Sequence, residues 1–186
     1  MRADEGGPYG GRVMSRAPSV MAVAAVLMAA SATAARLPVP ATLDPPAGEV
    51  LLMELAAKGV QIYECRAKAG ATPAQEWAFV APEAELFDAS GRRVATHGAG
   101  PHWLAPDGSR VEGTVKARAD ASSAWAIPWL LLTTKSTGSA GMFARVTSVQ
   151  RVDTEAGTAP ATLCGPENVG ASARVPYTAV YRFFGA

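Results

Sequence analysis

The sequence predicts a mainly β fold, a single antiparallel β-sandwich or barrel-like domain with long loops. Apolar and polar residues alternate with a period of two in many short segments, which is typical of half-buried strands. Turn signals separate these segments, and the 186 residues include 18 Gly and 14 Pro. No long stretch after Gly59 has the period of an amphipathic helix.

An uncharged apolar run, residues 20–30, lies between Arg16 and the small residues Ala32-Thr33-Ala34. A basic stretch, a short apolar core and small residues are the three parts of a secretory signal peptide, which we therefore predict over residues 1–34. An uncleaved N-terminal anchor is the alternative, but the run is short for a bilayer. We expect an exported, periplasmic or extracellular protein with no membrane span in its mature chain. Two start sites remain open, Met1 and Met14.

Residues 49–186 are expected to form the β-rich domain, after an extended lead-in at 35–48 whose four prolines disfavour regular structure. The first segment, 49–57, is open between helix and strand, because Leu, Met, Glu and Ala favour helices. We prefer a strand–turn–strand hairpin over 49–65, with its turn at Lys58-Gly59.

The rest of the domain alternates strand-like segments with turn signals such as Asp88-Ala-Ser-Gly91 and Pro106-Asp-Gly-Ser109. The run 127–134 is continuously apolar, which favours a strand buried on both faces. Tyr177, Ala179, Tyr181 and Phe183 share one face of the last strand. The expected strands after the first hairpin are 76–82, 85–87, 93–97, 103–104, 111–117, 127–134, 143–152 and 177–184.

Charge and cysteine content narrow the function classes. The chain has 17 basic and 16 acidic residues and no basic run, so we expect no nucleic-acid partner. Cys65 and Cys164 are an even pair in an exported chain, which favours one disulfide over free thiols or metal ligands. A bridge that closes a loop of about 100 residues stabilises the fold by roughly 4–5 kcal/mol in the chain-entropy model.

One loop carries the candidate catalytic residues. His97 and His102 flank a Gly-rich turn, and with Asp107 they could form a two-His, one-carboxylate metal site. Ser109 is a candidate nucleophile, although it lacks the elbow motif that usually presents one. The structural alternative is that the histidines serve as a turn cap and a surface residue, and that Asp107-Gly-Ser109 is a plain β-turn.

Aromatic and basic side chains provide candidate binding residues. Trp103 and Trp125 lie in turn-rich segments, and exposed Trp on a β-domain commonly contacts sugars or proteins. The alternative places all the tryptophans in the core, most plausibly Trp77 and Trp129. Two arginines expected on one face of the strand 143–152 could bind an anion or simply be solvated, namely Arg145 and Arg151.

Several motifs together resemble one known family. They include His97-Gly-Ala-Gly-Pro-His-Trp103, Ile127-Pro-Trp129 and the closing Tyr177-Thr-Ala-Val-Tyr181. The chain resembles, over nearly all of residues 48–186, exported bacterial and fungal proteins catalogued as a domain of unknown function, some fungal members being named malate dehydrogenase. The resemblance implies no established activity. The family usually has Thr at position 102 and Gly at position 156, which weakens a role for His102.

The sequence argues against NAD-dependent malate dehydrogenase activity. A dinucleotide site needs glycines between a strand and a helix N-terminus, so that amide groups meet the pyrophosphate. Here Gly98-Ala-Gly100 is followed by Pro101, Trp103 stands where a third Gly belongs, and no helical pattern follows. We therefore reject NAD-dependent malate dehydrogenase activity for this protein.

Two hypotheses of function follow. The first is an exported, disulfide-bonded, non-catalytic β-domain that binds a ligand or partner at the cell envelope, such as a glycan or an envelope protein. The alternative is a small metal-assisted or hydrolytic enzyme that uses His97, His102 and Asp107. No cofactor is predicted, and a bound metal ion is expected only if the second hypothesis holds.

Overall fold

The computed structural model describes residues 38–70, 72 and 74–186 of the chain. The expected signal peptide, residues 1–34, and the first part of the lead-in, residues 35–37, lie outside the described residues.

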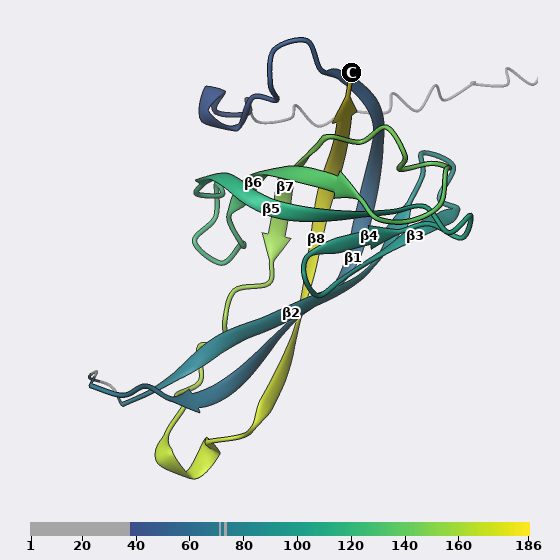
Figure 1. Ribbon diagram of the computed structural model, residues 1–186. Coiled ribbons are helices and arrows are strands. Elements are labelled where there is room, and N and C mark those ends of the chain that lie inside the picture. The colour runs from purple at the N-terminus through teal and green to yellow at the C-terminus, as the bar shows by residue number, and fades with distance from the viewer. Residues whose placement is uncertain (1–37, 71, 73) are drawn as a thin grey trace, which may run out of the picture. The chain divides into compact units, whose positions relative to one another are not determined.

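Eight antiparallel strands form a closed barrel in which each strand pairs with the next and β8 pairs back with β1 (Figure 1). This confirms the mainly β fold and selects a barrel over a sandwich. Two short 3₁₀ helices also occur in the described part, η1 (Ala41–Leu43) and η2 (Pro166–Asn168). The strands are β1 (Val50–Ala67), β2 (Gln75–Phe87), β3 (Arg93–Gly98), β4 (His102–Leu104), β5 (Arg110–Ala119), β6 (Trp129–Ser136), β7 (Ser148–Ala156) and β8 (Ser172–Gly185).

Strand β1 corrects the predicted hairpin, because it runs without a turn through Lys58-Gly59. Gly59 pairs with Ala84 of β2, and a Cβ placed on Gly59 would lie 2.1 Å from the carbonyl oxygen of Glu83. Glycine therefore serves here as the point of closest approach between two strands. The two short strands expected at 76–82 and 85–87 are likewise one strand, β2, which passes through Pro82.

Strands β1, β2 and β8 continue beyond the barrel as a three-stranded ribbon (Figure 1). Strand β2 pairs with β3 over residues 84–87, while its pairing with β1 extends on to Gln75. Strand β8 pairs with β1 as far as Ser172, beyond its last pair with β7 at Tyr177. The ribbon carries Cys65 on its central strand.

The barrel interior is filled in part by one face of β8. Tyr177, Ala179, Tyr181 and Phe183 are all buried, as their alternation predicted. They pack against side chains from the other strands and from the segment before β7, which include Leu55, Leu86, Trp103, Val111, Leu132, Phe143 and Val149.

The lead-in covers the outer face of β6 and β7. Leu132 of β6 belongs to the inner core, whereas Trp129 and Leu131 form an outer cluster with Leu43 of η1. The side-chain amide of Gln150 donates a hydrogen bond of 2.6 Å to the carbonyl oxygen of Leu43. This cover explains why the sequence around β6 is continuously apolar, and it confirms the expected burial on both faces.

Strand β7 begins at Ser148, so the predicted strand 143–152 starts too early. Residues 142–145 form a turn instead, and Arg145 is exposed there. The expectation that Arg145 and Arg151 share one face of a strand is therefore wrong. Strand β7 also contains a bulge between Val152 and Glu155.

Ala156, at the end of this irregular strand, has a φ of 55°, in the left-handed region that costs an L-residue about 1–2 kcal/mol. We predict that Ala156→Gly raises the free energy of unfolding by about 1 kcal/mol, because Gly adopts this conformation without a Cβ clash. Urea denaturation measures the change. Ala173→Gly, in a regular part of β8, is the control and should lower stability; equal losses for both substitutions would contradict the argument.

Candidate functional site

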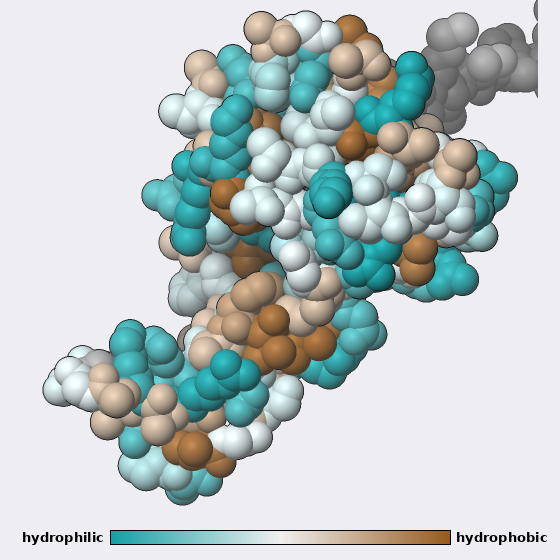
Figure 2. All heavy atoms as spheres, viewed as in Figure 1, coloured by the Kyte–Doolittle hydropathy of each residue, from teal (hydrophilic) through white to brown (hydrophobic). Residues whose placement is uncertain are grey.

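A cavity of about 540 Å³ opens into the barrel. Its volume lies in the range of about 300–1,000 Å³ that is usual for small-molecule sites. The strands contribute mostly apolar and aromatic walls, and three loops contribute Gly100 and Pro101, Ile127 and Pro128, and Thr158 and Ala159. Figure 2 shows hydrophobic residues gathered on the surface where the ribbon leaves the barrel. Three exposed apolar side chains line the cavity as well, Phe79, Val80 and Val115.

A cluster of three rings forms part of the cavity wall. His97 of β3 stacks on Trp103 of β4 with ring centroids 4.7 Å apart and planes 12° apart. Tyr181 of β8 meets both rings, at 5.1 Å from His97 and 5.5 Å from Trp103. Gly113 makes room for the indole, because a Cβ there would lie 3.0 Å from it. Trp103 is therefore fully buried, which corrects its interpretation as an exposed binding residue.

Arg151 projects from β7 into the same cavity. Its Nε and Nη2 donate hydrogen bonds of 3.1 and 2.8 Å to the carbonyl oxygen of Pro128, which fixes the plane of the guanidinium. Burial raises the pKa of Tyr181, and the charge of Arg151 acts in the opposite direction. At Tyr63 too, burial raises the pKa of the phenol, and the charge of Arg151 opposes this effect.

Gln61 of β1 is a member of the site that the sequence analysis missed. Its side chain is buried, and its Nε2 has no hydrogen-bond partner among the described residues. The indole Nε1 of Trp103 also has no hydrogen-bond partner among the described residues. The available signal was the alternation of residues 60–65, which places Gln61 on the same face as Tyr63 and Cys65; these are the residues that β1 buries.

His97 is held neutral in this wall. Its Nδ1 lies 2.8 Å from the carbonyl oxygen of His102, so the ring donates from that nitrogen. Burial lowers the pKa of His97 to about 3, against a smaller opposite effect of this hydrogen bond. The ring of His102 hydrogen-bonds instead to Ala99 O, at 2.7 Å, within the turn between β3 and β4. The segment Gly98-Ala-Gly100 belongs to this turn between strands.

Asp107 and Ser109 stabilise a different turn, the one between β4 and β5. The carboxylate of Asp107 accepts hydrogen bonds from the Ser109 amide and hydroxyl, at 2.8 and 2.6 Å, and from the Met142 amide at 2.8 Å. The Ser109 hydroxyl lowers the pKa of Asp107 most, followed by the Met142 amide. The Ser109 hydroxyl oxygen also accepts from the Phe143 amide. Both groups thus hold the segment 142–143 against the turn between β4 and β5.

The structure therefore does not bring the four candidate catalytic residues together in one site, although Asp107 and Ser109 hydrogen-bond to each other. Of these, His97 lines the cavity, while His102, Asp107 and Ser109 each serve a turn. Within residues 38–70, 72 and 74–186, no three His, Cys, Asp or Glu side chains gather so that they could hold a metal ion.

The remaining candidates lie outside the cavity lining. Trp125 is 70% exposed, in the loop before β6. Arg145 is exposed in the turn before β7. Trp129 is buried in the outer cluster, as expected for a core tryptophan.

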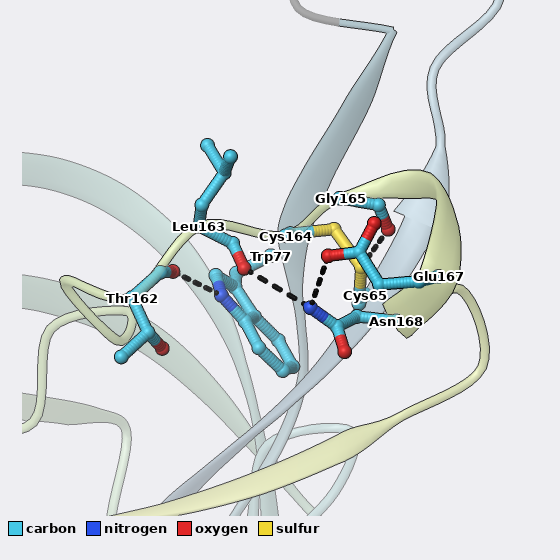
Figure 3. Close-up of a disulfide and its surroundings, with 8 residues drawn as sticks. All are labelled: Cys65, Trp77, Thr162, Leu163, Cys164, Gly165, Glu167 and Asn168. Atoms are coloured by element: carbon cyan, nitrogen blue, oxygen red, sulfur yellow. Dashed lines mark hydrogen bonds between the residues drawn. A yellow bond between two sulfur atoms is a disulfide. The ribbon is translucent and has the colours of Figure 1, made fainter.

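The disulfide joins Cys65 of β1 to Cys164 in the loop before β8, with Cα atoms 5.5 Å apart (Figure 3). The indole of Trp77 donates a hydrogen bond of 2.9 Å to Thr162 O in the same loop. Nearer the barrel, the Tyr63 hydroxyl donates to Gly157 O at 2.7 Å. Because Thr158 and Ala159 line the cavity, these contacts fix one wall of the site.

The fold and the site define a disulfide-bonded, closed eight-stranded barrel with an internal cavity. The chain belongs to the family described as "Protein of unknown function (DUF3455)", which matches residues 46–185 and confirms the resemblance seen in the motifs. No curated protein matches the chain. Among the described residues, helices of the length and apolar character needed to cross a bilayer are absent.

We predict that the free energy of unfolding falls as the pH is lowered, because the folded protein keeps His97 neutral. The folded protein keeps this ring neutral down to about pH 3, whereas the unfolded chain takes up a proton below its ordinary pKa of 6.5. The free energy of unfolding should fall by about 1.2 kcal/mol between pH 6 and 5, and its slope should approach about 1.4 kcal/mol per pH unit below pH 5. Urea titrations at several pH values measure this slope. His97→Gln should flatten it; a slope in this variant equal to that of the wild type would contradict the assignment.

The disulfide should be a major source of stability. The double substitution Cys65→Ala with Cys164→Ala should lower the free energy of unfolding by about 4 kcal/mol, because the unfolded chain regains the freedom of a loop of about 100 residues. Urea denaturation followed by circular dichroism measures the loss. Reductant should shift the midpoint of the wild type and leave that of the double variant unchanged. A wild-type midpoint indifferent to reductant would refute the prediction.

Proposed function

We propose that this protein is an exported, non-catalytic binding protein of the cell envelope that holds one small, largely apolar molecule inside its barrel. The observation that carries the proposal is the cavity of about 540 Å³ within a closed eight-stranded barrel. A barrel of this strand number has an interior that side chains fill completely or that holds one small ligand. Here side chains fill part of the interior and leave the rest hollow.

The composition of the wall supports an apolar ligand. Aliphatic and aromatic side chains predominate in it, for example Leu130, Leu132 and Trp103. A few polar groups converge among them, a pattern usual for small-molecule sites. At the mouth, Phe79 and Val115 are 53% and 52% exposed, an arrangement that a bound apolar molecule would partly cover.

The rigidity of the frame supports binding without large rearrangement. Backbone pairing around the closed barrel fixes the strands, and the disulfide and Tyr63 fix the loop at 157–159. A preformed site loses less conformational entropy when a ligand binds.

Export is supported by the signal-like N-terminus together with the disulfide, because disulfides persist in oxidising compartments. A small molecule is favoured over a glycan or an envelope protein as the ligand, because Trp103 faces the barrel interior and lines the cavity, whereas Trp125, the other tryptophan predicted to bind, is exposed away from the cavity lining.

We predict that the disulfide-bonded protein binds the neutral fluorescent probe N-phenyl-1-naphthylamine with one-to-one stoichiometry. Leu130→Trp places extra volume in the cavity and should weaken binding at least about tenfold, since the probe loses its space. A fluorescence titration measures both affinities.

Val50→Trp is the matched control, because Val50 is an exposed β1 residue outside the cavity lining. It should bind the probe as the wild type does. The proposal fails if the folded wild type does not bind the probe, or if the two tryptophan variants bind it equally well.

A further inference from the structure

The charged groups of the cavity all have one sign. Arg118 and Arg151 belong to its lining, and the described residues contribute no Asp or Glu to it. Arg118 is exposed, whereas Arg151 is half-buried. Among the described residues, no carboxylate forms a salt bridge with Arg151. Because burying a charge without an oppositely charged group beside it is unfavourable, the cavity favours an anion next to Arg151.

Arg151 is oriented for such a partner. Pro128 O accepts hydrogen bonds from its Nε and Nη2, and the Tyr181 phenol lies within reach of the same guanidinium, which leaves at least two of its five N–H groups for a ligand. A fixed, planar guanidinium recognises a planar carboxylate through paired N–H donors.

Two further donors in the wall make no hydrogen bond of ordinary geometry with the described residues, although the Gln61 amide lies beside the Tyr177 hydroxyl. Gln61 Nε2 belongs to a side chain that is 2% exposed, and Trp103 Nε1 to one that is 0% exposed. Nearly all buried donors in native proteins are hydrogen-bonded, and an indole nitrogen can only donate. An acceptor that enters the cavity would satisfy Trp103 Nε1, and the Gln61 amide, which lines the same cavity, offers a second donor.

Each of the three donor-bearing residues lies near Tyr181 or near its neighbour Tyr177. The Trp103 ring lies 5.5 Å from the Tyr181 ring, and Arg151 acts on the pKa of the Tyr181 phenol. The hydroxyls of Tyr181 and Tyr177 are 3.4 Å apart, and Gln61 interacts with Tyr177. Donor-bearing residues of β1, β4 and β7 therefore line the same cavity as Tyr181.

We infer that the ligand is a carboxylate-bearing amphiphile, with its carboxylate bound by Arg151 and by the Gln61 and Trp103 donors. This inference rests on the proposed function and adds the chemical class of the ligand. The apolar part lies against the aliphatic wall and reaches the mouth at Phe79, Val80 and Val115. A cationic amphiphile is disfavoured, because it meets like charge and offers no acceptor.

The test compares amphiphiles of equal chain length in displacement of N-phenyl-1-naphthylamine at pH 7.5, namely decanoate, decanol and decyltrimethylammonium. The wild type should bind decanoate at least about tenfold more tightly than decanol, since charge-assisted hydrogen bonds are the stronger ones. It should bind the cationic amphiphile most weakly. This comparison needs no variant.

Arg151→Gln should weaken decanoate binding at least about tenfold and change decanol affinity less than about threefold. Arg145→Gln removes an exposed arginine outside the lining and should change neither affinity. Melting curves and retained probe binding establish that each variant is folded.

The outcomes separate the two proposals. If the wild type binds neither the probe nor any amphiphile, the proposed function itself is wrong. If it binds the probe and decanol but shows no preference for decanoate, or if Arg151→Gln keeps that preference, the cavity binds apolar molecules and the inference about the carboxylate is overturned.

Discussion

Antiparallel pairing between β1 and β8 closes the barrel, and the candidate site depends on that closure. The two strands pair from Val50 with Gly185 to Glu64 with Ser172. Closure removes the free edges that both strands would otherwise expose and turns one face of every strand toward a common interior. Residues far apart in the sequence, such as Gln61, Arg151 and Tyr181, therefore line one cavity. Gly59 is part of the same constraint, because it lets β1 approach β2 closely along its length.

The interior is divided between packing and function. Aromatic and aliphatic side chains such as Phe143 and Phe183 fill one part, with ring centroids 5.0 Å apart. The hollow part holds a half-buried guanidinium that has no carboxylate partner among the described residues, and two donors that make no hydrogen bond of ordinary geometry with those residues. Such groups lower stability unless a ligand supplies an acceptor. The outer cluster beneath the lead-in and the disulfide stabilise the same barrel from outside its core. Such external support is consistent with an interior shaped for a ligand rather than for maximal stability.

Local patterns predicted the fold class, the disulfide and the buried face of β8, because alternation, turn signals and cysteine count depend on neighbouring residues or on composition. They placed a turn at Lys58-Gly59, because a glycine needed for close approach looks the same in sequence as one needed for a turn. The site was predicted in part. His97 and Arg151 were named, but Trp103 was expected at the surface. Gln61 was missed because alternation indicates only which face of β1 is buried, whereas its place beside Arg151 and Tyr181 arises from barrel closure.

The most direct measurement of the central claim is a ¹H–¹⁵N spectrum of the indole groups during titration with N-phenyl-1-naphthylamine. The four tryptophans lie in different surroundings: Trp103 lines the cavity, Trp129 lies in the outer cluster, Trp77 contacts the disulfide loop and Trp125 is exposed. The account predicts a large, saturable shift of the Trp103 indole signal, with the Trp125 signal unchanged. Saturable shifts confined to Trp125, with the Trp103 signal constant, would contradict it.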